Sequence, residues 1–172
     1  SDTRVIYASP LVDVAGNMEL VRETVEMCKL ILEHTNWQIR LLSKSNLLFK
    51  LAQMIDDDYR DRMIYGVSTG TLDDKLAKAF EKGTALVSKR LESLHKLQDE
   101  GYRTYGMICP SLPQEDYDKF ARDMAQAIRV DRCEHVWAEV INIRGKSFER
   151  TIEALNAGGL KREAEQLEEV RR

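Results

Sequence analysis

The sequence predicts an α/β protein: a partial, open (β/α) barrel of about five parallel strands with helices outside. Short runs rich in apolar and β-branched residues alternate with longer stretches in which apolar residues recur every three or four positions. Such alternation returns each strand in the same direction, so the strands run parallel. The strand runs are also nearly continuous in apolar residues, as expected when helices cover both faces. A doubly wound sheet fits the same pattern.

Size and composition suit a single domain with a sizeable core. The chain has 172 residues, of which 43% are hydrophobic and 32% charged, and a net charge of −3. This charge gives no global attraction for nucleic acid or an anionic membrane. No apolar run approaches the roughly 18 residues of a membrane span. The three separated cysteines, Cys28, Cys109 and Cys133, are typical of free thiols in the cytoplasm.

The strands are expected where apolar runs end at polar or proline-containing turns. They are residues 4–9, 38–43, 63–68, 102–109 and 136–141, with Pro10 and Pro110 stopping the first and the fourth. The first run, with its β-branched Val5 and Ile6, is expected to be a buried strand.

Caps and breakers mark the helices between these strands. Asn17 can cap the first, whose apolar stripe runs from Met18 to Leu32. Ser45 and Asn46 can cap the second, Thr71 or Asp73 the third. Further helices are expected from Thr84 to a stop at Gly101, at 113–128 behind Pro113, and at 147–170 with a break at 158–159.

Candidate functional side chains cluster where strands end, because ligands bind there in both architectures. They are Ser9, Asp13, Lys44, Ser68, Thr69, Glu139, Asn142 and Arg144.

Several of these side chains suit particular chemistry. Lys44 can form a Schiff base or pair with a carboxylate or phosphate, with a solvated lysine as the alternative. Ser68 and Thr69 beside a glycine suit a ribose, although one hydroxyl would serve as a helix cap. Arg144 can clamp an anion or belong to a salt-bridged rim. The charges of Glu81 and Lys82 are typical of a helix end and are assigned no chemistry, and the histidines show no metal-ligand spacing.

An ordered set of short motifs runs through most of the chain. It comprises RLLSKS at 40–45, GVST at 66–69, FEKGT at 80–84, RLESL at 90–94 and Gly101-Tyr102. This set resembles the radical S-adenosylmethionine (SAM) proteins of the spore photoproduct lyase type, often called DNA repair photolyases. The resemblance covers about residues 5–144. It implies an incomplete six-stranded barrel similar to a TIM barrel, SAM as cofactor, a [4Fe–4S] cluster, and DNA as a substrate.

The resemblance also assigns roles to the strand-end residues. It places Lys44 near the SAM carboxylate and Ser68 and Thr69 near the ribose. Ser9 and Asp13 would lie near the amino end of SAM. The last strand would present three residues to the cofactor or substrate: Glu139, Asn142 and Arg144.

The cluster motif of the family, Cys-x-x-x-Cys-x-x-Cys, is not found in this sequence. We therefore expect this chain to bind no cluster and to be inactive alone, either as a fragment of a longer radical SAM enzyme or as a relative that lost its cluster. One alternative is a cluster-free SAM- or nucleotide-binding module or partner subunit. Another is an unrelated barrel lyase that uses Lys44. The open edge of the first strand predicts either a homodimer or a covering helix, with residues 160–170 as the candidate.

Overall fold

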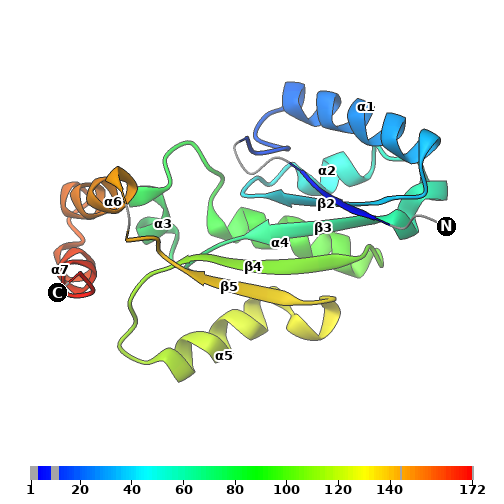
Figure 1. Cartoon of the computed structure of the whole chain (residues 1–172). Coiled ribbons are helices and arrows are strands. Elements are labelled where there is room, and N and C mark those ends of the chain that lie inside the picture. Colours follow the sequence, from blue (N-terminus) through cyan, green and yellow to red (C-terminus); the bar gives the residue numbers. More distant parts are fainter. Residues whose placement is uncertain (1–3, 9–11, 144, 172) are drawn as a thin grey trace.

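The structure is a computed structural model that describes residues 4–8, 12–143 and 145–171. It confirms the α/β half-barrel. In the described residues five parallel strands follow one another in the order β1-β2-β3-β4-β5 (Figure 1). Their bounds are β1 Val5–Tyr7, β2 Gln38–Ser43, β3 Met63–Ser68, β4 Thr104–Ser111 and β5 Val136–Val140.

Helices connect successive strands outside the curved sheet, and two more helices follow the last strand (Figure 1). The helices are α1 Met18–His34, α2 Leu48–Ala52, α3 Asp74–Phe80, α4 Val87–Asp99, α5 Tyr117–Ile128, α6 Lys146–Ala157 and α7 Lys161–Glu169, with short 3₁₀ turns at Asp57–Arg62 and Val130–Arg132. None of the described helices has the length and apolar character needed to cross a membrane.

Local sequence explains where most elements begin. The Asn17 side chain accepts a hydrogen bond from the Leu20 N–H at 2.9 Å and caps α1, as predicted. Asp73 caps α3 in the same way. The α5 helix starts at Tyr117 rather than at Pro113, because Asp116 supplies the cap by accepting from the Lys119 N–H. Ser45 makes a turn with the Leu47 N–H, so α2 begins later than expected.

Strands β2 and β3 match their predicted limits, but β4 extends through Pro110 to Ser111. The prediction that Pro110 ends this strand is wrong. The register between β4 and β5 shifts between Ile108 and Ser111, so no regular ladder bond is required from the position of the proline.

The centre of the sheet is covered on both faces and its edges are not. All six residues of β3 are buried, whereas β5 is mostly exposed and β1 buries none of its residues completely. The prediction of a buried first strand is therefore wrong, because β1 is an edge strand that pairs only with β2 among the described strands. The main core lies between the outer face of the sheet and the helices α1, α2 and α4.

A second, smaller core holds the C-terminal helices. Phe148 and Leu155 of α6 pack with Ala164 and Leu167 of α7, together with Leu112 after β4. The α6–α7 hairpin contacts α3 and lies at the carboxyl ends of the strands (Figure 1). The suggestion that residues 160–170 cover the β1 edge is thus wrong, since α7 buries its apolar face on α6. The homodimer along that edge stays a prediction.

Candidate functional site

A pocket of about 490 Å³ lies on the concave side of the sheet, toward the carboxyl ends of the strands. Its walls come from all five strands and the loop after β1. The lining residues are Tyr7, Ala8, Val12, Asp13, Arg40, Leu42, Ser43, Lys44, Ser68, Tyr105, Met107, Cys109, Trp137 and Glu139. The volume falls within the roughly 300–1,000 Å³ of small-molecule sites.

Four of the predicted site residues line this one pocket: Asp13, Lys44, Ser68 and Glu139. They follow or belong to four different strands, so only the curvature of the sheet brings them together.

The other predicted site residues in the described part of the chain are not among the residues that line this pocket. Thr69 is fully buried, and its hydroxyl donates to the Thr71 carbonyl at 2.5 Å, which shapes the turn before α3. Asn142 is exposed beyond the end of β5 and is not part of the lining. Ser9 and Arg144 lie outside the described residues. The predicted ribose contact of Thr69 is therefore not supported by its position.

Asp13 organises the strand ends. One carboxylate oxygen accepts from the Ser43 hydroxyl at 2.5 Å and the Ala15 N–H at 3.0 Å, and the other accepts from the Lys44 N–H at 2.7 Å. Its carboxylate thus joins the loop after β1 to the end of β2. Asp13 holds the backbone of Lys44 in place as well as lining the pocket.

Lys44 belongs to a chain of three charged residues that runs from the pocket into the protein. Its ammonium pairs with one oxygen of Glu81, at the end of α3, and the other oxygen accepts from Arg90 of α4 at 2.7 Å. Exposure of the side chains falls along this chain, from 28% for Lys44 to 6% for Glu81 and 0% for Arg90. Lys44 at the pocket wall is therefore anchored by the nearly buried Glu81–Arg90 ion pair.

Arg90 also connects the second and third strand ends. Its guanidinium donates to the carbonyl of Ser68 at 3.1 Å, to the carbonyl of Ala85 at 2.8 Å and to the Thr84 hydroxyl at 2.7 Å. These acceptors satisfy a buried charge that would otherwise be costly. One buried arginine thus positions both Lys44, through Glu81, and the end of β3.

The far wall of the pocket combines a thiol with a carboxylate. The Cys109 sulfur of β4 lies 4.0 Å from a carboxylate oxygen of Glu139 on β5. Burial raises the pKa of the Cys109 thiol; Lys44 opposes this rise, while Glu139 and Glu81 add to it. Ser68 faces the same wall, donating to the Cys109 carbonyl at 3.2 Å.

The floor of the pocket is aromatic. The Arg40 guanidinium lies 5.7 Å from the ring centroids of both Tyr7 and Tyr105. Gly66 makes room for the Tyr105 ring, because a Cβ at that position would come within 2.3 Å of it. The absent side chain of Gly66 thus allows a large ring to lie across β3.

Across the floor the two edge strands meet through their side chains. Tyr7 of β1 and Trp137 of β5 stack with their ring centroids 6.1 Å apart, and His135 lies 4.6 Å from Trp137. Arg40 donates to the His135 ring at 2.6 Å. Burial lowers the pKa of His135 and Arg40 lowers it further, against the opposing effect of Glu134. A neutral imidazole is the form that accepts this hydrogen bond.

Sequence reasoning missed the residues that hold the site together. Glu81, taken as a helix-end charge, and Arg90, noted only as part of a motif, form the buried anchor of Lys44. Arg90 occurs in an otherwise apolar helix stripe with Val87, Leu94 and Leu97, which is the one signal that it faces inward. Nothing in the local pattern marks Arg40 or His135 as partners, since they lie 95 residues apart.

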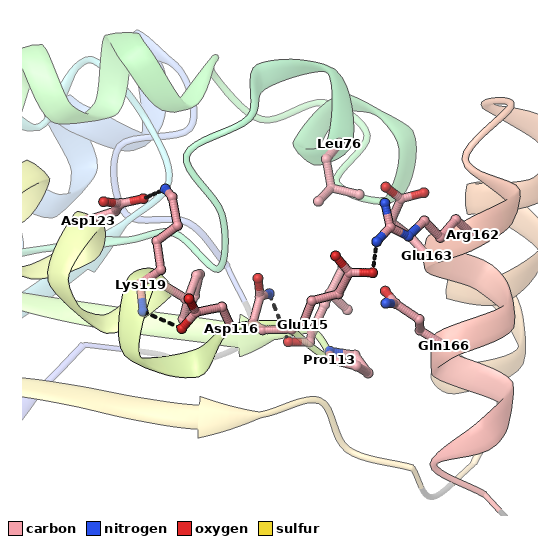
Figure 2. A pocket seen from close by; sticks show the side chains of 12 residues that line it. Leu76, Pro113, Glu115, Asp116, Lys119, Asp123, Arg162, Glu163 and Gln166 are labelled. Atoms are coloured by element: carbon pink, nitrogen blue, oxygen red, sulfur yellow. Dashed lines mark hydrogen bonds and ion pairs between the residues drawn. The ribbon is translucent and has the colours of Figure 1, made fainter.

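A second cavity of about 340 Å³ lies outside the barrel, between the loop after β4, the start of α5, and α7 (Figure 2). Arg162 of α7 pairs with Glu115 across it, and Lys119 pairs with Asp123 on one wall. Both cations of the lining are thus paired, while Asp116 and Glu163 leave it with an excess of negative charge. None of the predicted site residues in the described part of the chain lines it, so the concave pocket is the stronger candidate.

The described residues provide no metal site. No three histidine, cysteine, aspartate or glutamate side chains among them are grouped to hold a metal ion. Cys28 is buried in α1, and burial raises its pKa to about 12, which opposes a thiolate ligand. The described residues therefore do not fit an iron–sulfur cluster.

Comparison with known proteins adds one relative. In an alignment of 100 residues that covers 54% of the chain, it is 30% identical to the uncharacterized protein ORF301 of Acidianus two-tailed virus. This chain spans about a third of that relative's length, since the matched part is 32% of it. No protein-family model matches the chain, and no solved structure matches it.

Proposed function

We propose that this chain binds SAM in the concave pocket, as the nucleoside-binding part of a radical SAM protein. One observation supports this assignment more than any other. Asp13, Lys44, Ser68 and Glu139, to which the sequence resemblance assigns contact with SAM or substrate, line a single pocket at the carboxyl ends of parallel strands.

The charges of the pocket suit the amino-acid end of SAM. This end carries a carboxylate and an ammonium, so it needs a cation and an anion near each other. Lys44 supplies the cation, and the carboxylates of Asp13 and Glu139 line the same pocket. Such a mixed pair favours a zwitterion over a simple anion.

The remaining lining suits the nucleoside end. The Ser68 hydroxyl offers a hydrogen-bonding group for a ribose, and the rings of Tyr7, Tyr105 and Trp137 offer faces on which a planar base can stack.

A radical SAM enzyme uses a reduced [4Fe–4S] cluster to cleave SAM to a 5′-deoxyadenosyl radical. Because the described residues do not fit that cluster, the proposal for this chain is limited to holding SAM. Cluster ligands, and with them radical chemistry, would come from outside the described residues.

Calorimetric titration of the whole chain with SAM and with its stable analogue S-adenosylhomocysteine tests the proposal. We expect saturable binding at one site, weakened roughly tenfold or more by Lys44→Ala, because a charge-assisted contact is lost. Lys29→Ala on the exposed side of α1 removes the same charge far from the pocket and should bind like the wild type. Absence of binding to the wild type, or equal binding by both variants, would contradict the proposal.

A further inference from the structure

The Lys44–Glu81–Arg90 chain contains more positive than negative charge. Two cations share one carboxylate, and each takes a different oxygen of Glu81. Arg90 is fully buried and is held by three further acceptors, so it stays with Glu81. Lys44 is the cation in excess and the one that faces the pocket.

The two ion pairs of Glu81 differ in what their loss would cost. If Arg90 moved away, a buried guanidinium and the Ser68 and Ala85 carbonyls would lose partners. If Lys44 moved away, Glu81 would remain neutralised by Arg90, and the Lys44 ammonium would still be at the pocket surface, where its side chain is already 28% exposed. Only the Lys44 contact can therefore be given up without leaving an unpaired buried charge.

We infer that Glu81 holds Lys44 in the empty pocket and releases it to an anionic oxygen group of the bound ligand, so that Glu81 sets the affinity for carboxylate-bearing ligands. This inference rests on the proposed function for the identity of the ligand, whose carboxylate replaces that of Glu81. Glu81 acts through Lys44 and is a positioning residue. A competing carboxylate in the wall lowers the affinity for ligands that must take Lys44 from it and leaves the affinity for ligands without an anionic group nearly unchanged.

If the ligand replaces Glu81 as the partner of Lys44, substitution of Glu81 has the opposite effect on ligand affinity from that expected for a purely structural residue. Glu81→Gln keeps the length of the side chain and an oxygen that accepts from Arg90, but removes the charge that holds Lys44. If ligand and Glu81 compete for Lys44, this variant binds the carboxylate-bearing ligand more tightly. If Glu81 only supports the pocket, the same variant binds it more weakly.

Calorimetry with two ligands that differ in the amino-acid end tests the competition. We expect E81Q to bind S-adenosylhomocysteine roughly fivefold more tightly than the wild type, as for release of a partly buried ion pair. Binding of 5′-methylthioadenosine, which has the same nucleoside and thioether but no carboxylate, should change less than about twofold. Glu81→Asp, which keeps the charge beside Arg90 while retracting it from Lys44, should likewise raise the affinity for S-adenosylhomocysteine and leave that for 5′-methylthioadenosine nearly unchanged. Weaker or unchanged binding of S-adenosylhomocysteine by folded E81Q and E81D would overturn the inference.

A second readout does not depend on SAM. Cys109 lines the pocket, and its thiolate attacks the methylene carbon of iodoacetate or iodoacetamide, forming a C–S bond and releasing iodide. Iodoacetate carries a carboxylate and iodoacetamide does not. Site-resolved mass spectrometry therefore gives the ratio of the two alkylation rates at Cys109, with Cys133, which does not line the pocket, as the internal reference.

We expect E81Q to raise this rate ratio at Cys109 about two- to fivefold and Lys44→Ala to lower it, with little change at Cys133. If the wild type binds neither nucleoside ligand, the proposed function fails, and the alkylation ratio still decides whether Glu81 competes for Lys44. If the ratio is the same in wild type, E81Q and K44A, the inference fails even where SAM binds.

Discussion

Arginine side chains are compensated differently at the centre and at the edges of the sheet. Near β3, Arg90 is fully buried and opposed by a carboxylate and three oxygen acceptors. Between β1 and β5, Arg40 lies against aromatic rings, donates to a neutral histidine and pairs at 3.6 Å with the carboxylate of Glu134, whose side chain is 31% exposed. The Nε of Arg40 is buried without a hydrogen-bond partner among the described residues. The comparison indicates that the centre contributes stability, whereas the edge region depends on protonation and remains partly open to solvent.

The largest effect is expected at the centre. Arg90→Met keeps the volume of the side chain but removes the donors to Glu81 and to the Ser68 and Ala85 carbonyls. We expect the free energy of unfolding to fall by about 3–5 kcal/mol, the cost of breaking a buried ion pair from one side. Urea unfolding followed by circular dichroism measures it.

The matched control lies one residue away on α4. Lys89→Met removes a cation from the exposed face of the same helix and should leave the urea midpoint unchanged. Equal effects of the two substitutions would contradict the central role of Arg90.

A smaller loss is expected where the centre supports the edge cluster, which consists of Arg40, Tyr105, His135 and Trp137. Gly66→Ala places a Cβ within 2.3–2.6 Å of the Tyr105 ring, which stacks on His135 and lies beside Arg40. Overpacking of this kind costs about 1–3 kcal/mol. Urea unfolding should show the loss, and Gly16→Ala, whose Cβ would meet nothing closer than 3.4 Å, is the control. A stable G66A protein with unchanged tyrosine near-ultraviolet dichroism would show that the ring is not confined there.

The smallest effect is a pH dependence confined to the edge cluster. The folded state lowers the pKa of His135 below its ordinary 6.5, so the unfolded state binds the proton first as the pH falls. The contribution of His135 is therefore fully present above about pH 6.5 and is lost progressively below it. Because the pair is partly solvated, we expect a loss of at most about 1 kcal/mol by pH 5.

Urea unfolding at pH 7.5, 6 and 5 for the wild type and His135→Gln measures this contribution. The glutamine oxygen can still accept from Arg40 but does not titrate in this range, so the variant should lose less stability on acidification. An identical decline in both proteins would assign the pH dependence to other groups.

Regular elements could be predicted because their signals are local. The periodic apolar stripe and the Asn17 cap predict α1, and the runs 38–43 and 63–68 coincide with β2 and β3. Exposure of β1 could not be predicted in this way, since a short apolar run reads the same at an edge as in the middle of a sheet. The position of the α6–α7 hairpin could not be predicted from the sequence either. An amphipathic pattern shows which face of a helix is buried but not against which element it packs.

The sequence by itself determined the order of strands and helices, the edge at which their polar turns meet, and the residue types available there. Parallel βα connectivity places every strand end at the same edge whatever the details of packing. Only the tertiary structure decided which of those residues share a pocket. Asp13, Lys44, Ser68 and Glu139 do, whereas Thr69 turns inward to the Thr71 carbonyl. The buried partners of Lys44 also emerged only in three dimensions, because Glu81 and Arg90 reach it from α3 and α4 across distances in sequence that no local pattern encodes.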